Sequence, residues 1–327
     1  MATKTVIQAL HDALWQEMER DDRVVVLGED VGVRGGVFLA TDGFIERFGD
    51  ERVIDTPLAE GAIVGVAIGA AVAGLRPVAE IQFADFIYPA VDQIVSEAAK
   101  LRYRSRGAFS CPLVIRAPYG GGIHGGLHHS QCPENMFAQV PGLRVVAPTT
   151  PHDVAGLLRA SIRDPDPVLF FEHKKAYRSI RGEVPEGDYT VPIGRADVKR
   201  AGRDLSVITY GYMLHEALAA AEAAAAEGIE AEVVDLRTLA PLDRETILGS
   251  VVKTSKALIV HEANLTGGIG GEVAALIAAE AFESLDGPVL RIATPDVPAL
   301  PYVDSWEAYC LPNAEKILEG IRKLSAY

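Results

Sequence analysis

Short apolar runs alternate with amphipathic segments along the first half of the chain. The apolar runs include RVVVLGED (23–30), RPVAEIQF (76–83) and CPLVIRAP (111–118). Continuous apolar runs that end at polar positions are typical of strands buried on both faces of a parallel sheet. Between them lie segments with helical spacing, one of which begins near Pro89 and another near Pro151. The alternation predicts a parallel sheet that is covered by helices on both faces.

The stretch from 178 to 204 interrupts this alternation, because it is rich in Gly, Pro and charged residues and has little periodicity. After it the pattern restarts with strands in 205–211, 229–238, 256–263 and 288–295, and helices in 214–228, 242–254 and 270–285. We therefore predict an α/β protein with two parallel-sheet domains, residues 1–186 and 201–327, joined by a linker at 187–200.

Composition narrows the classes of function. Apolar residues make up 49% of the 327 residues, so the chain can bury a large core and disorder is excluded. The net charge of −14 argues against a nucleic-acid surface or an anionic membrane, because phosphate binding needs clustered Lys and Arg. The one basic run, KLRYRSR (100–106), is interpreted as a solvated helix face or a subunit contact.

Cysteine usage and the N-terminal residues indicate a reducing compartment, and we expect the cytoplasm. The three cysteines form no CxxC pair and no even framework. Residues 1–22 predict an amphipathic helix with acids throughout, unlike a signal or transit peptide. The apolar run 61–75 is too short to cross a bilayer, which takes roughly 20 residues, and its small residues suggest a closely packed buried helix.

Two glycine-rich stretches invite a nucleotide-binding interpretation that their spacing does not support. GGIGGEV (267–273) resembles part of a dinucleotide fingerprint, but it follows a loop and lacks the third glycine. GGGIHGG (120–126) lacks the GK[ST] ending of a P-loop. Tight turns or close backbone approach are the favoured interpretation of both stretches.

Three histidines cluster in the second of these loops, at His124, His128 and His129. His124 and His128 have the i, i+4 spacing of a metal-binding pair, but that spacing needs a helix and Gly125 and Gly126 lie between them. A loop that presents imidazoles to a cleft is favoured instead. Histidine is suited to proton transfer near neutral pH, although a loop histidine taken alone is more often structural.

Glu60 stands directly before the apolar run 61–75. We expect Pro57 in the first helical turn, with Asp55 or Thr56 as the N-cap. A capping box from Thr56 needs Glu or Gln at position 59, which is Ala59. Glu60 therefore either favours the helix dipole, worth roughly 0.3–1 kcal/mol, or has a functional role.

Five segments together resemble the β subunit of the decarboxylating component of 2-oxoacid dehydrogenase complexes, which are thiamine diphosphate enzymes with a transketolase-like fold. The segments are LGEDVGVRGGVF, DTPLAEGAIVGVAIGAA, AEIQFADFIYPAVDQIVSEAAKLRYRS, HHSQCPE and VDLRTLAPLD. The resemblance covers essentially the whole chain in order. It implies a pyrimidine-binding domain followed by a transketolase C-terminal-like domain.

The resemblance implies a role for Glu60. The family's equivalent glutamate meets a nitrogen of the aminopyrimidine ring and drives it to the imino tautomer, which takes the proton from the thiazolium carbon. A carboxylate at the mouth of an apolar helix suits this task, because a low dielectric strengthens its hydrogen bond to the ring. The cofactor supplies the electron sink, while the protein supplies orientation and electrostatics.

Further residues carry over by position. His129 matches the catalytic histidine near the substrate, which would exchange a proton during decarboxylation or acyl transfer to lipoamide. Phe86 resembles the aromatic residue that stacks on the pyrimidine. The cofactor-lining positions are Glu29, Leu58, Ala59, Glu60, Gln82 and Phe86, and the substrate positions are Phe83, Phe86 and His129.

The chain lacks the GDG sequence with which thiamine diphosphate enzymes hold Mg²⁺ and the diphosphate. A diphosphate needs a metal or backbone donors. The resemblance thus implies that a separate α subunit supplies the diphosphate half of the site and the Mg²⁺ ligands, in a heterotetramer of two α and two β chains that works with a lipoyl acyltransferase.

The sequence leaves alternatives for the 2-oxo acid substrate and for the class of protein. QFADFIYPAVDQI resembles the branched-chain members, so we favour a branched-chain 2-oxo acid such as 2-oxoisovalerate over pyruvate. A pyruvate or acetoin dehydrogenase β subunit is the alternative within the family. The C-terminal segment TPDVPALPYVDSWEAYCLPN follows the family pattern only loosely. A non-catalytic assembly or docking subunit, and a self-sufficient transketolase-like enzyme, are the alternatives from other classes.

Overall fold

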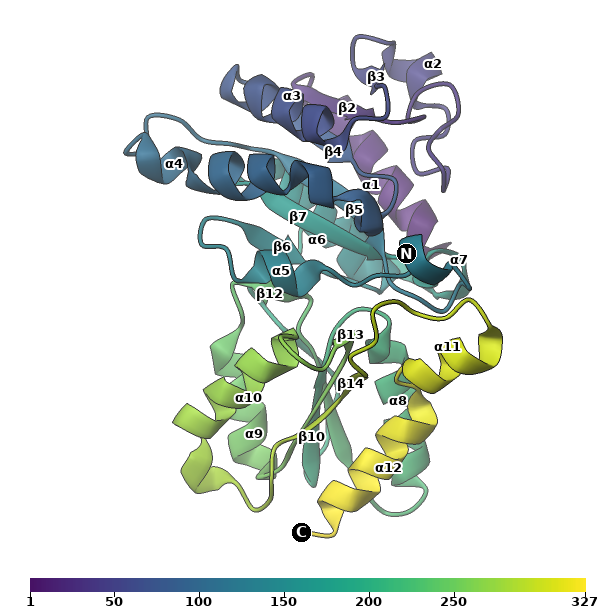
Figure 1. The fold of residues 1–327 in the computed structure, drawn as a ribbon, viewed down its shortest axis with the longest axis vertical. Helices are drawn as coiled ribbons and strands as arrows, with labels where there is room; N and C mark the ends of the chain where they lie inside the picture. The colour runs from purple at the N-terminus through teal and green to yellow at the C-terminus, as the bar shows by residue number, and fades with distance from the viewer. The chain divides into compact units, whose positions relative to one another are not determined.

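The computed structural model describes residues 1–327 as two compact units, which are described separately (Figure 1). The first unit comprises Met1–Tyr119 and Met136–Ile193, and the second comprises Gly120–Asn135 and Gly194–Tyr327. Both are α/β units with a largely parallel sheet, so the predicted fold class is confirmed. No helix is long and apolar enough to span a membrane.

The first unit has a parallel sheet whose strands follow the order β6-β7-β5-β4-β2-β3. The strands are β2 (Val24–Gly28), β3 (Val53–Asp55), β4 (Arg76–Glu80), β5 (Val114–Tyr119), β6 (Arg144–Val146) and β7 (Val168–His173). Every residue of β2, β5 and β7 is buried, which is the expected result for continuous apolar runs in the middle of a sheet.

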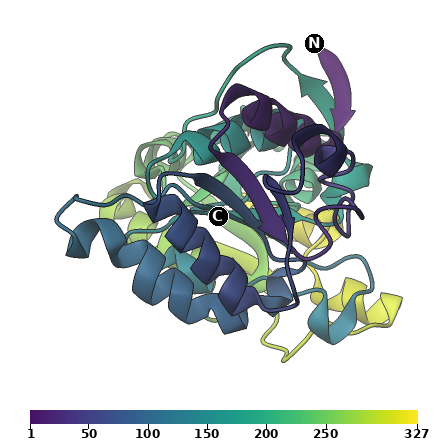
Figure 2. The same cartoon turned by 90° about the horizontal axis from the view of Figure 1, so that it is seen from above.

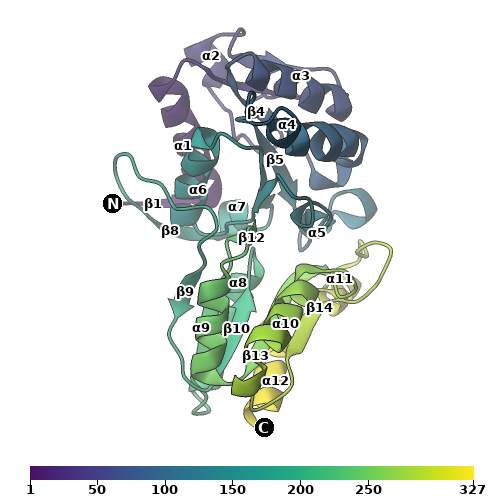
Figure 3. The same ribbon diagram turned by 90° about the vertical axis from the view of Figure 1, so that its left-hand side faces the viewer.

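Helices cover both faces of this sheet. On one side α1 (Val6–Arg20) packs on α6 (Pro151–Arg163), and on the other lie α3 (Glu60–Val72) and α4 (Leu101–Arg104) (Figure 3). Thr150 caps α6 by accepting from the amide of Asp153, with Pro151 at the first helical position as predicted. The remaining short helices are α2 (Phe44–Phe48), α5 (Glu134–Ala138) and α7 (Ala176–Ser179).

The helix predicted from Pro89 onward is present but irregular. A 3₁₀ turn at Tyr88–Ala90 leads into a π-helical turn at Gln93–Glu97, a second 3₁₀ turn at Ala98–Lys100 and then α4. This segment runs beside α3 (Figure 2). The close approach depends on Gly61, because a Cβ there would lie 3.0 Å from the carbonyl oxygen of Pro89. Small residues therefore pack α3 closely, as the sequence predicts.

The prediction for the start of α3 was wrong by one turn. The helix begins at Glu60 with Ala59 as N-cap and no side-chain cap, and Pro57 lies before it. Asp55 does not cap the helix because its carboxylate accepts a 2.6 Å hydrogen bond from the amide of Gly32. Glu60 is consequently the first helical residue, nearer the end of the helix than the pattern suggested.

The N-terminal residues and the stretch 178–204 also differ from expectation. Ala2–Thr5 form β1, which pairs antiparallel with β8 (Arg181–Val184), so the predicted N-terminal helix starts only at Val6. Within the expected linker, Asp197–Arg200 form β9. Its charged residues hid it from a periodicity analysis, but charges are common on strands at the edge of a sheet.

The second unit has a five-stranded sheet in the order β14-β13-β10-β11-β9, with only β9 antiparallel. Its parallel strands are β10 (Leu205–Thr209), β11 (Ala231–Asp235), β13 (Ala257–Asn264) and β14 (Leu290–Thr294), and a short strand β12 (Thr238–Ala240) follows β11. Strands β10, β11 and β14 fall within runs predicted from the sequence, and β13 extends one residue beyond its predicted run at 256–263.

Helices again cover both faces. One face carries α8 (Met213–Ala225) and α12 (Ala314–Ser325), and the other carries α9 (Arg244–Thr254) and α10 (Ile269–Glu280) (Figure 1). Helix α11 (Asp304–Cys310) precedes α12. A core of buried aliphatic residues lies between the sheet and the pair α8 and α12, so this unit has a hydrophobic core of its own.

The segment Gly120–Asn135 groups with the second unit, although its chain neighbours on both sides belong to the first. The sequence division at 1–186 placed this segment in the first domain. The physical reason for the difference is that side chains of the second unit bind the backbone of this segment, as described below.

Candidate active site

Glu60 occupies the N-terminus of α3, where the backbone amides of the first turn have no partners within the helix. Its side chain is largely buried, with 9% of its surface exposed. The partial positive charge at the end of a helix favours a carboxylate in this position. Because Ala59 cannot cap the helix, Glu60 is the acidic group available at this end.

Glu29 and Gln82 follow the neighbouring parallel strands β2 and β4, whose carboxyl ends meet at one edge of the sheet. The Gln82 Nε2 atom lies 3.4 Å from the Glu29 carbonyl oxygen and 3.4 Å from Asp30 Oδ2, and it donates to both. Burial, and then the carboxylates of Glu60 and Asp30, raise the pKa of Glu29. The structure therefore brings Glu29, Glu60 and Gln82 into one polar group.

Aromatic side chains lie next to this group. Phe83 directly follows Gln82, and its ring lies 5.7 Å from that of Phe86 and 5.4 Å from that of Phe38, edge-on in both pairs. Phe83 and Phe86 are half-buried, whereas Leu58 is 79% exposed and Ala59 is exposed. Half-exposed rings and an open apolar residue beside a buried carboxylate suit a flat heteroaromatic ligand.

These residues fit one end of thiamine diphosphate. A carboxylate can accept a hydrogen bond from a protonated pyrimidine nitrogen or from an amino group on the ring, and aromatic faces can stack on the ring. The group contains the carboxylates of Glu29, Asp30 and Glu60. Two cations lie at its edge, because Arg34 pairs with Asp30 at 3.5 Å and the Lys174 ammonium lies 5.7 Å from the centre of the Phe83 ring. The chemistry of the donor set thus agrees with a pyrimidine site.

Beneath this edge lies a buried ion cluster that the sequence analysis missed. Arg116 on β5 is fully buried and donates to Glu80 Oε2 at 2.6 Å. It also donates to both carboxylate oxygens of Glu172, at 2.6 and 2.8 Å, and the Tyr177 hydroxyl donates to Glu172 as well. A signal existed in the sequence, because Glu80 and Arg116 are charged residues inside two predicted buried strands, where a charge needs a partner.

His129 belongs to the second unit and Glu60 to the first. His129 ends a 3₁₀ turn, Gly126–His128, and is half-buried, whereas His128 is exposed. The predicted loop is confirmed, since no helix joins His124 to His128. Gly120, Gly122 and Gly126 have φ angles of 88°, 74° and 60°, which explains why this loop needs glycine.

Two acidic side chains and one tyrosine of the second unit hold this segment. The amide of Gly121 donates to Glu262 at 2.5 Å and that of Gly122 to Glu307 at 2.8 Å. At the end of the segment, the Tyr210 hydroxyl donates to Glu134 at 2.7 Å. No sequence motif points to Glu262, Glu307 or Tyr210, because their partners are 141, 185 and 76 residues away along the chain.

The stretch GGIGGEV serves close packing, as the sequence predicts. A Cβ at Gly268 or Gly270 would lie 2.5 or 2.6 Å from the ring of His261. Burial lowers the pKa of His261 to about 4, and its Nδ1 atom lies 3.0 Å from the carbonyl oxygen of Ala263. Its ring stacks on Tyr210 with centroids 6.3 Å apart, so these glycines admit an uncharged imidazole below the loop.

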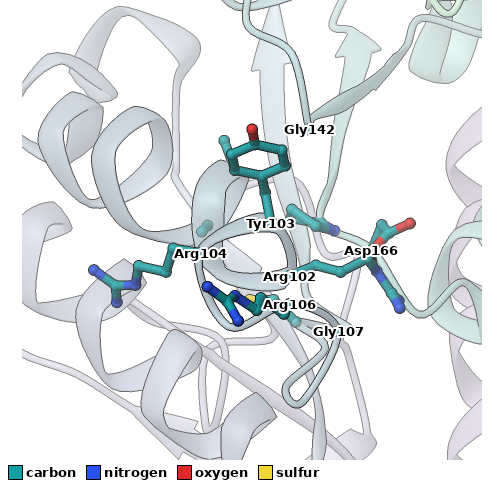
Figure 4. A pocket seen from close by; sticks show the side chains of 11 residues that line it. Arg102, Tyr103, Arg104, Arg106, Gly107, Gly142 and Asp166 are labelled. Carbon is teal, nitrogen blue, oxygen red and sulfur yellow. Dashed lines mark hydrogen bonds and ion pairs between the residues drawn. The ribbon is translucent and has the colours of Figure 1, made fainter.

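A pocket of about 800 Å³ opens around the basic run, and none of the predicted site residues lines it (Figure 4). Its wall includes Arg102, which pairs with Asp166 at 2.5 Å, and the 89% exposed Tyr103. Burial raises the pKa of Cys111 in this wall to about 12, so the thiol is protonated and unreactive.

Comparison with known families identifies both units. The family described as "Transketolase, pyrimidine binding domain" matches residues 2–179. The family described as "Transketolase, C-terminal domain" matches residues 194–317.

Curated relatives match along their whole length. The "2-oxoisovalerate dehydrogenase subunit beta" of Bacillus subtilis (strain 168) is 58% identical over 327 residues, which is 100% of both chains. The "Pyruvate dehydrogenase E1 component subunit beta" of the same organism is 52% identical over 324 residues, 99% of both chains. Its namesake in Staphylococcus epidermidis is 47% identical over 319 residues, 98% of both chains.

A solved structure described as "Split gene transketolase, inactive beta4 tetramer" has a TM-score of 0.80, covers 98% of both chains and is 24% identical. At this identity the likeness concerns the fold alone. It agrees with the arrangement of helices and strands described above.

Proposed function

We propose that this chain, together with an α subunit, catalyses the thiamine diphosphate-dependent oxidative decarboxylation of a 2-oxo acid. The chain belongs to the family of 2-oxoacid dehydrogenase β subunits, which are built from transketolase pyrimidine-binding and C-terminal domains. The acyl product passes to the lipoyl group of an acyltransferase. The observation that carries the proposal is full-length identity of 58% and 52% to two such β subunits.

The preferred substrate is a branched-chain 2-oxo acid such as 2-oxoisovalerate. Supporting this choice, the 2-oxoisovalerate dehydrogenase relative is more similar than the pyruvate dehydrogenase relative, at 58% against 52% identity. The aromatic pair Phe83 and Phe86 adds an apolar wall that suits a branched acyl group. Pyruvate is the second candidate, because that relative is also similar along its full length.

Glu60 is the residue proposed to activate the cofactor. When bound, thiamine diphosphate supplies the carbanion and the electron sink for decarboxylation. Glu60 would accept a hydrogen bond from a protonated pyrimidine nitrogen and so hold the proton on the ring. The helix end at α3 and the burial of the side chain make this contact strong, because little water competes for it.

The flanking residues orient the pyrimidine. Phe86 stacks on the ring, and Gln82 and Glu29 line its polar side from the carboxyl ends of β4 and β2. Leu58 and Ala59 cover it from the turn before α3. Ligand sites in open parallel sheets lie outside the carboxyl ends of the strands, which is where these residues are found.

His129 is proposed to donate and accept a proton at the substrate. An imidazole serves this purpose near neutral pH, and as imidazolium it also pairs with the substrate carboxylate. Phe83 and Phe86 contact the acyl part of the substrate in this proposal. General acid–base assistance of this kind typically contributes about 10²–10⁴-fold to a rate.

The α subunit is proposed to supply the Mg²⁺ ligands and the diphosphate site, in an assembly of two α and two β chains. Two observations support a partner chain. The sequence has no GDG metal-binding motif. The second unit also exposes large apolar side chains on and beside α11, including Trp306 (68% exposed) and Tyr309 (77%), as contact surfaces do.

The test is co-expression of this chain with an α subunit of the same family from the same organism, followed by assay of the purified complex. Formation of NADH should be followed with the acyltransferase and lipoamide dehydrogenase components over a panel of 2-oxo acids. We expect turnover that requires both chains and thiamine diphosphate, with the highest kcat/KM for branched-chain substrates. A stable complex without turnover on any 2-oxo acid would favour a non-catalytic docking subunit.

A further inference from the structure

The loop that carries His129 is held in an unfavourable backbone conformation. His124 has a φ of +57°, a region that side chains with a Cβ rarely adopt. Gly122 and Gly126 on either side are also left-handed, at 74° and 60°. Such a conformation persists only where the surroundings impose it, so contacts outside the loop must hold it.

Glu307 on α11 supplies several of these contacts. Its side chain is 2% exposed, and its Oε1 atom accepts from the amide of Gly122 at 2.8 Å. Its Oε2 atom accepts from the amide of His124 at 3.3 Å and lies 2.8 Å from His124 Nδ1. One buried carboxylate therefore fixes the left-handed residue through both its backbone and its ring.

Glu262 holds the adjoining residue from the end of β13. Its Oε1 atom accepts from the amide of Gly121 at 2.5 Å and lies 3.5 Å from the Cys132 sulfur. Gly121 fits between the two acids, since a Cβ there would lie 3.5 Å from Glu262, 3.4 Å from Glu307 and 2.5 Å from Leu300. Two neighbouring amides thus meet two different carboxylates.

A direct contact links the fixed residues to His129. Gly125 follows His124, and a Cβ at Gly125 would lie 2.6 Å from the carbonyl oxygen of His129 and 2.8 Å from its Cβ. The backbone of Gly125 therefore packs against His129. Any shift at His124 moves the surface on which His129 rests.

We propose that Glu307, assisted by Glu262, is a positioning residue for His129. The inference rests on the proposed function, in which His129 transfers a proton to the substrate. Glu307 contacts no reacting atom in this proposal, but fixes the loop so that the imidazole stays at its working distance. Misplacement of a catalytic group by about 1 Å can cost about 10²-fold in rate.

The first test measures the loop itself, in the complete chain with its α subunit. The variant is Glu307→Gln, which keeps the shape but replaces one acceptor oxygen with a donor that faces the loop amides. The matched control is Asp304→Asn, because Asp304 also approaches His124 Nδ1, at 3.3 Å, from an 85% exposed position. Amide hydrogen exchange at residues 121–125 should accelerate at least tenfold in Glu307→Gln and remain unchanged in the control.

The second test measures catalysis. Glu307→Gln should lower kcat for the complete reaction by about 10–100-fold with little change in KM. In a His129→Ala background the same substitution should have almost no further effect, because there is no imidazole left to position. A merely structural loss would multiply with His129→Ala and would lower the thermal unfolding midpoint. Glu262→Gln provides a second variant with the same expectations, should Glu307→Gln not fold.

The outcomes separate this inference from the proposed function. If the wild-type complex decarboxylates no 2-oxo acid, the proposed function is wrong, and hydrogen exchange still decides whether Glu307 fixes the loop. Unchanged hydrogen exchange at residues 121–125 in both Glu307→Gln and Glu262→Gln overturns the inference. So does a loss of kcat that is equally large with and without His129.

Discussion

The hydroxyl of Tyr210 donates a 2.7 Å hydrogen bond to Oε1 of Glu134 in the interior of the second unit. Burial, despite this hydrogen bond, raises the pKa of Glu134 from its usual 4.5 to about 7, and the charge of Glu262 adds to the rise. The other oxygen of Glu134 is buried without a partner. Deprotonation of Glu134 therefore places an incompletely solvated charge in the folded unit.

We expect stability to fall as pH rises from about 4.5 to about 7 and to level off above that range. A carboxyl group whose folded pKa is raised stabilises the fold fully below its unfolded pKa, near 4.5, and loses that contribution as pH passes the folded pKa. The shift corresponds to roughly 3 kcal/mol above pH 8. Glu134→Gln removes this dependence, because its amide oxygen still accepts from Tyr210 and carries no charge.

Urea unfolding between pH 5 and pH 9 checks this prediction. The advantage of Glu134→Gln over the wild type should be largest at pH 9 and should disappear near pH 5. The exposed Glu283→Gln serves as control and should follow the wild type throughout. An advantage that is constant with pH would mean that Glu134 is not the titrating group.

Glu60→Ala should leave the fold intact and abolish activation of the cofactor. The carboxylate sits at the N-terminus of α3, which has no side-chain cap and no other acid in its first turn. The measurement is exchange of the proton at the thiazolium carbon, followed by NMR in the assembled complex. Glu46→Ala, which removes an exposed acid from the first turn of α2, is the control. A wild-type exchange rate in Glu60→Ala would refute the assignment.

The isolated chain should bind thiamine diphosphate weakly or not at all, even with Mg²⁺. The described candidate site offers a carboxylate, an amide and aromatic rings, which can hold the pyrimidine but not a metal-bound diphosphate. Calorimetry on the chain alone and on the complex with the α subunit provides the comparison. Submicromolar affinity of the isolated chain would show that it contains a complete site.

His129→Ala should reduce complete turnover by about 10²–10⁴-fold with little change in cofactor affinity. The contacts proposed for the cofactor, at Glu60 and Phe86, remain in this variant. His128→Ala is the matched control, since His128 is the exposed neighbour and should matter much less. Steady-state kinetics measures the loss of turnover, and titration with thiamine diphosphate measures the cofactor affinity of each variant. Equal losses in both variants, or a loss caused mainly by cofactor release, would make the loop a structural clamp.

Arg116→Met should destabilise the first unit by about 3–5 kcal/mol, because it leaves Glu80 and Glu172 buried without their partner. Arg104→Met removes an ion pair with Glu97 whose side chains are 56% and 40% exposed, and should cost about 0–1 kcal/mol. Thermal unfolding of the two variants compares these losses. Similar midpoints would mean that the buried cluster contributes little beyond packing.

The sequence alone determined the parallel strands and the helices between them. Continuous apolar runs such as Val24–Gly28 can be satisfied only where both faces are covered, so local pattern and tertiary structure agree there. The loop of His129 was also predictable, because Gly125 and Gly126 prevent a helix between His124 and His128. The segment around Glu60 could be matched to the family because the matching motifs are short and contiguous in the sequence.

Only the tertiary structure decided what holds those residues in place. Gly121 and Glu262 are 141 positions apart, and Gly122 and Glu307 are 185 apart, so no local periodicity connects them. The same holds for Asp55, which looks like a helix cap in sequence but binds Gly32 instead. Secondary-structure propensity and hydrophobic patterning act over a few residues. A buried carboxylate, in contrast, accepts hydrogen bonds from donors that the fold places beside it, wherever they lie in the sequence. The loop that carries His129 therefore belongs to the second unit because of long-range contacts and not because of its neighbours in the sequence.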